Sequence, residues 1–101
     1  MRILLVCNAG MSSSILVDKM KKAAAIKNED VVIEARSNNG LGEEKGKWDV
    51  CLVGPQIIYA VDSIQETLQI PVAAVEPRTY AMANGEEALQ QAHKLHDERK
   101  A

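Results

Sequence analysis

A chain of 101 residues predicts a single domain, residues 1–101, built around one core. Its 12 basic and 14 acidic residues leave a net charge of -2, so the chain lacks the basic excess that a nucleic-acid-binding surface needs. Hydrophobic residues make up 47% of it, a globular composition rather than a disordered one, but no apolar run approaches the roughly 18 residues that cross a bilayer.

Four short segments are predicted to be strands. In chain order they are residues 3–6, 31–35, 50–53 and 72–75. Three of them are apolar at every position, whereas the second places apolar side chains at alternate positions. Short runs that are apolar on both faces are typical of strands buried in a parallel sheet.

Apolar residues recur at helical spacing in the stretches between and after the strands, at 15–24, 57–68 and 88–95. Pro55 is suited to the first turn of the second helix, where a missing N–H costs nothing. Asn84, with Glu87 three positions later, predicts a capping box at the start of the third. Residues 37–48 are rich in Asn, Gly, Lys and Glu, and they predict a loop with room for one short helix.

The alternation of strands and helices predicts an α/β fold, a single four-stranded parallel sheet flanked by helices on both faces. In such sheets ligands bind beyond the carboxyl ends of the strands, near the point where the strand order reverses. The first predicted strand ends at Cys7, which makes this cysteine the leading candidate for chemistry.

The segment that follows Cys7 has the composition of an anion-binding loop. It leads into a predicted helix, whose first-turn N–H groups and dipole favour negative charge. Glycine permits a positive φ, and the serine hydroxyls add donors. We expect the phosphate-binding loop to consist of Asn8, Ala9, Gly10, Met11, Ser12, Ser13 and Ser14.

The same loop favours the ionised sulfur of Cys7, and a thiolate inside a phosphate-sized cradle is a phosphoryl acceptor. The alternative is that Cys7 is a small buried apolar residue and that the serines only cap the helix. Cys51 lies inside an apolar strand, so we expect it to pack in the core. The two cysteines form neither a disulfide framework nor a zinc pattern.

With this loop after an N-terminal strand, the chain resembles enzyme IIB of the bacterial phosphoenolpyruvate-dependent phosphotransferase sugar-uptake system, of the lactose/cellobiose (N,N'-diacetylchitobiose) type. The resemblance extends to the Gly54-Pro55-Gln56-Ile57 turn after the third strand and to Tyr80 after the fourth. It implies a fold similar to that of low-molecular-weight tyrosine phosphatases. It also implies that Cys7 takes a phosphoryl group from a phosphohistidine of enzyme IIA and gives it to a sugar, a disaccharide by this resemblance, held by the membrane channel enzyme IIC.

A second function with a similar loop is that of a low-molecular-weight tyrosine-phosphatase-like or arsenate-reductase-like enzyme. Phosphatases with a Cys-x5-Arg loop hold an arginine six positions after the cysteine, and that position is Ser13 here. Glu76 before Pro77 resembles their general acid, but an acid without the arginine is an incomplete hydrolase. A third possibility, a non-catalytic binding module, predicts no phosphoryl group on Cys7.

The rim of the loop should contact both partners, because donor and acceptor must reach Cys7. We expect Met11, Gln56 and Ile57 to be exposed there, with Tyr80 as a further rim residue. His93 and His96 lie three positions apart without a carboxylate partner on another element, so neither a metal nor a cofactor is expected. We expect a cytoplasmic monomer that associates with the membrane permease and has no nucleic-acid partner and no inserted segment.

Overall fold

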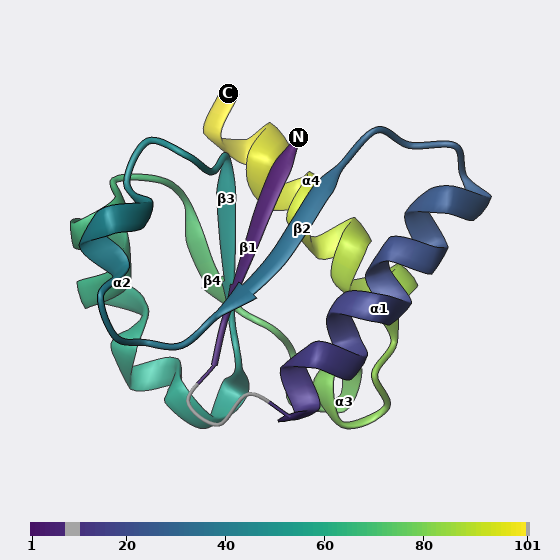
Figure 1. Ribbon diagram of the computed structural model, residues 1–101, viewed down its shortest axis with the longest axis horizontal. Coiled ribbons are helices and arrows are strands. Elements are labelled where there is room, and N and C mark those ends of the chain that lie inside the picture. The colour runs from purple at the N-terminus through teal and green to yellow at the C-terminus, as the bar shows by residue number, and fades with distance from the viewer. Residues whose placement is uncertain (8–10, 101) are drawn as a thin grey trace.

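A computed structural model describes residues 1–7 and 11–100, and the side chains of residues 1–7 and 14–98. One sheet of four parallel strands lies at its centre, in the order β2-β1-β3-β4 (Figure 1). The strands are β1 (Arg2–Val6), β2 (Val32–Arg36), β3 (Val50–Val53) and β4 (Val72–Ala74). The predicted parallel sheet is confirmed, and each strand begins within one residue of its expected start.

Helices cover both faces of the sheet, as the apolar strands predicted. The long helices α1 (Met11–Ile26) and α4 (Gly85–Lys100) pack together on one face, on the right in Figure 1. The other face is covered by α2 (Val61–Leu68) and by the 3-10 helices η1 (Leu41–Glu44) and η2 (Pro55–Ala60). A short helix, α3 (Pro77–Ala81), follows β4.

The central strand β1 divides its side chains between two core layers. Ile3 and Leu5 pack with α1 and α4, whereas Leu4 and Val6 pack with α2 and its neighbours, and all four are fully buried. This is the pattern expected of a strand buried on both faces. Burying each such side chain contributes about 1.5–3 kcal/mol, so the end of β1 is a rigid place to hold a reactive group.

The expected helix 57–68 is divided in two. Ile57 has φ -121° and ψ 35°, which are not helical angles, and only the part from Val61 onward is α-helical. Pro55 begins η2, and the Ile57 N–H donates to the Gly54 carbonyl oxygen at 3.0 Å, a tighter turn than an α-helix makes. The apolar stripe was correct for burial, but it did not distinguish a 3-10 turn from an α-helix.

Two further details agree with the sequence. The Glu87 N–H donates to the Asn84 side-chain oxygen at 3.1 Å, which confirms half of the predicted capping box at the start of α4. The return bond is not formed, because the Asn84 N–H donates to the Thr79 carbonyl oxygen and the Glu87 carboxylate accepts from the Thr79 hydroxyl, both at 2.9 Å. The stretch 37–48 contains one short helix, η1, and ends at the buried Trp48. The Trp48 indole N–H donates to the Glu44 carboxylate at 2.9 Å, and this bond holds the pKa of Glu44 below its usual value.

Candidate functional site

The strand order reverses between β1 and β3, the point at which α/β sheets bind ligands. From β1 the chain crosses to β2 on one side, whereas β3 and β4 lie on the other. The Cys7 N–H donates to the Arg36 carbonyl oxygen at 3.2 Å, and the Gly54 N–H donates to the Val6 carbonyl oxygen at 2.9 Å. The residues that follow β1 and β3 are therefore neighbours at this edge.

The Cys7 side chain is buried against a tyrosine from the far end of the chain. Its Sγ lies 3.1 Å from the hydroxyl oxygen of Tyr80, and either atom can donate the hydrogen bond. Both residues are 7% exposed. Helix α3, which contains Tyr80, is separated from the end of β4 by two residues and lies near the carboxyl edge of the sheet (Figure 1). Tyr80 was a rim candidate in the sequence, and the structure places it on the sulfur itself.

Gly54 lies beside the Cys7 sulfur and the Tyr80 ring, where there is little room for a side chain. Its φ of -57° and ψ of 141° are open to any residue. A Cβ at this position would lie 2.9 Å from the Gln56 Oε1, which is the end of a flexible side chain, 3.3 Å from the Cys7 Sγ and 3.6 Å from the Tyr80 ring. Gly54 entered the sequence analysis only as part of a turn that resembles the family, so its role in giving room to the sulfur was missed.

A hollow of about 410 Å³ opens beside Tyr80, between η2 and α3. Its lining is mostly apolar and includes Ile15, Pro55 and Pro77, together with Gln56. Four large apolar side chains near this end of the molecule are more than half exposed: Ile15, Ile58, Tyr59 and Met82. We call these four exposed side chains the collar. Exposed apolar patches of this kind are typical of surfaces that contact other proteins.

The expected rim is correct for Gln56 and wrong for Ile57. Gln56 is exposed, but Ile57 is fully buried, because the 3-10 turn directs its side chain into the core formed with α2. The exposed apolar residues of this turn are the next two, Ile58 and Tyr59. The helical stripe had already placed Ile57 with the core residues, and the burial agrees with it; the expectation of exposure came from the position of Ile57 in the turn after β3 and is wrong.

The predicted phosphate-binding loop lies partly outside the described residues. Asn8, Ala9 and Gly10 are not among them, nor are the side chains of Met11, Ser12 and Ser13. Helix α1 starts at Met11, so its amino end returns to the edge where β1 ends (Figure 1), and Ser14 in its first turn is exposed. The first-turn N–H groups of an α-helix have no acceptor within the helix, and the amino end of a helix such as α1, with 16 residues, carries a partial positive charge.

The other sequence candidates do not line the hollow beside Tyr80. Cys51 is fully buried within β3, as expected, and burial raises the pKa of its thiol to about 12. Glu76 is exposed and lines a different hollow, together with Thr79 and Glu87. The expectation that the two histidines have no carboxylate partner on another element is wrong for His93, which pairs with the Glu29 carboxylate in the turn after α1.

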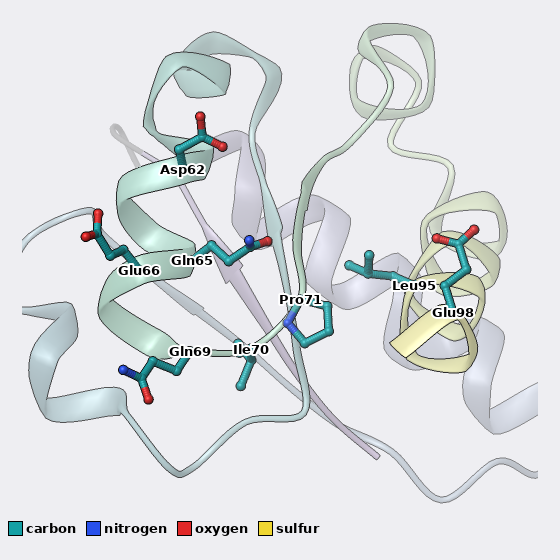
Figure 2. A pocket seen from close by; sticks show the side chains of 8 residues that line it. All are labelled: Asp62, Gln65, Glu66, Gln69, Ile70, Pro71, Leu95 and Glu98. Carbon is teal, nitrogen blue, oxygen red and sulfur yellow. The ribbon is translucent and has the colours of Figure 1, made fainter. Parts of the chain in front are cut away.

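A larger hollow, of about 750 Å³, lies along the edge of β4 between α2 and α4 (Figure 2). The residues that line it include the carboxylates Asp62, Glu66 and Glu98 and no cation. Three carboxylates repel a phosphate, so this hollow does not suit phosphoryl chemistry despite its size. Across the described part of the chain, no helix has the length and apolar character needed to cross a membrane.

Comparison with known proteins identifies related chains. A model of the family described as "PTS system, Lactose/Cellobiose specific IIB subunit" matches residues 2–91. The oligo-beta-mannoside-specific EIIB component of Bacillus subtilis (strain 168) is 36% identical over 97 residues, or 93% of this chain and 94% of that protein. The cellobiose-specific EIIB component of Lactococcus lactis subsp. lactis (strain IL1403) is 36% identical over 101 residues, or 92% and 94% of the two chains.

Two solved structures are similar over nearly the whole chain. The cellobiose-specific phosphotransferase IIB component from Borrelia burgdorferi superposes with a TM-score of 0.80 at 37% identity, over 97% of this chain and 93% of that one. The lactose-specific IIB component domain from Streptococcus pneumoniae has a TM-score of 0.81 at 18% identity, covering 95% and 97% of the two chains. At that identity the second likeness establishes the fold alone.

Proposed function

The chain belongs to the lactose/cellobiose-specific IIB subunit family of the PTS, a family of sugar-specific phosphoryl carriers, and we propose that Cys7 is the residue that carries the phosphoryl group. One observation carries this proposal, the position of Cys7. This residue directly follows β1 at the point where the strand order reverses, its thiol contacts Tyr80, and it precedes the amino end of α1 in the chain. This position combines a nucleophile with helix N–H donors that stabilise phosphoryl oxygens.

The chemistry consists of two in-line displacements. In the first, the ionised sulfur of Cys7 attacks the phosphorus of a phosphohistidine on enzyme IIA. An S–P bond forms, the N–P bond breaks, and the proton lost by the thiol ends on the histidine ring. In the second, a sugar hydroxyl at enzyme IIC attacks the phosphorus and the S–P bond breaks. The hydroxyl proton then passes through solvent to the sulfur, which restores the thiol.

A carrier must hold the group without losing it to water, and several features favour a carrier over a phosphatase. Position 13 holds serine where Cys-x5-Arg phosphatases hold arginine. Among the residues that the structure describes, those that line the hollow beside Tyr80 include no lysine and no arginine. Glu76, the one candidate general acid, faces the hollow on the other side of α3. A hydrolase needs a fixed cation and a proton donor at the same site.

The collar is the surface on which both partners would dock. Ile58 and Tyr59, on η2, are 62% and 76% exposed. Met82 is 67% exposed and lines a neighbouring hollow, which shares Ala83 with the hollow beside Tyr80. A phosphohistidine and a channel-bound sugar must reach the same sulfur in turn, so enzyme IIA and enzyme IIC would use overlapping surfaces. Each contact must be weak enough to release, which suits a small apolar patch.

Incubation with phosphoenolpyruvate and the upstream carriers tests this function. We expect the intact mass to rise by one phosphoryl group, and peptide mapping to locate the group on Cys7. Addition of membranes that contain enzyme IIC, together with sugar, should then remove the phosphoryl group from Cys7. Label on a histidine, or hydrolysis of an added aryl phosphate at a rate that matches transfer, would contradict the proposal.

Enlarging Gly54 should slow the acceptance of phosphate in proportion to the volume added. Gly54→Ala places a methyl group 3.3 Å from the Cys7 Sγ, a tight contact for which we expect a few-fold loss. Gly54→Val must displace the sulfur or the Tyr80 ring, and a displacement of about 1 Å costs roughly 100-fold in rate. The measurement is the rate of Cys7 phosphorylation by phosphorylated enzyme IIA.

Gly42→Ala is the matched control, because its new methyl group meets nothing within 4 Å. This control should accept phosphate at the unaltered rate. A Gly54→Val protein that is folded and as fast as the parent would show that the sulfur does not react from its position beside Gly54.

A further inference from the structure

The hydroxyl of Tyr80 is held on the Cys7 sulfur by the fold and not by chance contact of mobile side chains. The Tyr80 N–H donates to the Glu76 carbonyl oxygen at 3.0 Å, and the Tyr80 carbonyl oxygen accepts from the Ala83 N–H at 3.1 Å. The ring is buried in the same core layer as Cys7 and approaches Gly54. The oxygen therefore has a defined place, 3.1 Å from the sulfur.

We propose that Tyr80 is a catalytic residue whose O–H donates a hydrogen bond to the sulfur of Cys7 whenever that sulfur carries negative charge. A thiolate can only accept hydrogen bonds, so the phenol is the donor in that state. A hydrogen bond to a charged group is stronger than one between neutral groups. The contact consequently favours the thiolate over the thiol.

This inference rests on the proposed function, because it assigns Tyr80 a part in both transfer steps. Before acceptance, the O–H supports the ionised nucleophile. During delivery, the S–P bond breaks and its electron pair stays on the sulfur, where the same O–H stabilises the developing charge. Tyr80 keeps its proton throughout, and the proton of the sugar hydroxyl leaves through solvent. One donor thus serves both directions, as a carrier requires.

Tyr80→Phe tests the proposal, because it removes the hydroxyl and keeps the ring that packs in the core. We expect the rate of phosphoryl delivery to the sugar to fall about 10- to 150-fold, the range for a hydrogen bond to a charged group. Thr67→Val is the control: it also removes a hydroxyl, but from an exposed residue of α2 that donates to the Ser63 carbonyl oxygen and belongs neither to the site nor to the collar, so neither readout should change. Equal melting temperatures would establish that both variants are folded.

The second readout is the pH dependence of iodoacetamide alkylation, which needs no partner protein. Cys51 is fully buried with its pKa raised to about 12, so the alkylation rate reports on Cys7. With Tyr80→Phe, the midpoint of alkylation should move to higher pH, whereas a residue that only covers the core would leave the midpoint unchanged.

The outcomes separate this inference from the function on which it rests. If the parent protein is not phosphorylated on Cys7, the proposed function fails, while the alkylation midpoint still decides whether Tyr80 supports the thiolate. If Tyr80→Phe leaves the midpoint unchanged, the donor role of Tyr80 is overturned, whatever the delivery rate. A shifted midpoint with slower delivery supports the proposal.

Discussion

Replacing Cys7 with serine is expected to abolish phosphoryl transfer while leaving the protein folded. Serine is close to cysteine in size, so the buried position at the end of β1 should tolerate it. Its hydroxyl, however, is not ionised near neutral pH, whereas a thiol is a good nucleophile through its thiolate. We expect transfer to fall at least about 1,000-fold, as for other enzymes that lose their nucleophile. The measurement is incorporation of labelled phosphate and its passage to sugar.

Cys51→Ala is the matched control for that experiment. Cys51 is fully buried in β3 and its thiol is kept neutral by burial, so its loss should leave the transfer rate unchanged. The small cavity should lower the free energy of unfolding by about 1 kcal/mol. The two variants are thus expected to differ in opposite ways, one folded and inactive, the other active and less stable. A Cys7→Ser protein that still delivers phosphate to sugar would refute the assignment of Cys7.

The layers of the fold were predictable because they follow from local patterns. Strands that are apolar at every position, such as 3–6 and 50–53, need helices on both faces, and the structure has them. The order β2-β1-β3-β4 was not predicted, because four short apolar runs of similar composition do not specify which pairs are neighbours. Cys7 and Gly54 are neighbours because β1 and β3 are adjacent in that order. The contact between them therefore could not be predicted from either segment alone.

In the candidate site, too, local features could be predicted and contacts between distant segments could not. The cysteine at the end of β1 and the buried cysteine in β3 were assigned from their immediate neighbours in sequence. The contact between Cys7 and Tyr80 joins residues 73 positions apart. Tyr80 lies on α3, a five-residue helix too short to show a periodicity. Ile57 was expected at the rim because it belongs to the turn after β3, although its place in the apolar stripe predicted burial, and the structure agrees with the stripe.

Among the glycines that the structure describes, Gly85 is expected to be the one whose replacement with alanine lowers stability most. Gly85 begins α4 where it crosses α1, and a Cβ there would lie 2.2 Å from the carbonyl carbon of Lys19 and 2.5 Å from the nitrogen of Met20. These are backbone atoms, which cannot rotate away as a side chain can. Overpacking usually lowers the free energy of unfolding by about 1–3 kcal/mol, and we expect a loss of about 3 kcal/mol or more here. That is a large part of the free energy of unfolding of a typical protein, about 5–15 kcal/mol.

The strain should also reach Cys7, because α1 is the helix whose amino end returns to the edge of the sheet beside that residue. We therefore expect Gly85→Ala to lower both the urea midpoint and the rate of phosphate acceptance. Gly42→Ala is again the control, with nothing within 4 Å of the new methyl group and an expected change within about 0.5 kcal/mol. If the two variants unfolded at the same urea concentration, α1 and α4 would have to lie further apart at Lys19 than the structure has them. The close crossing of these helices would then not be what requires glycine at position 85.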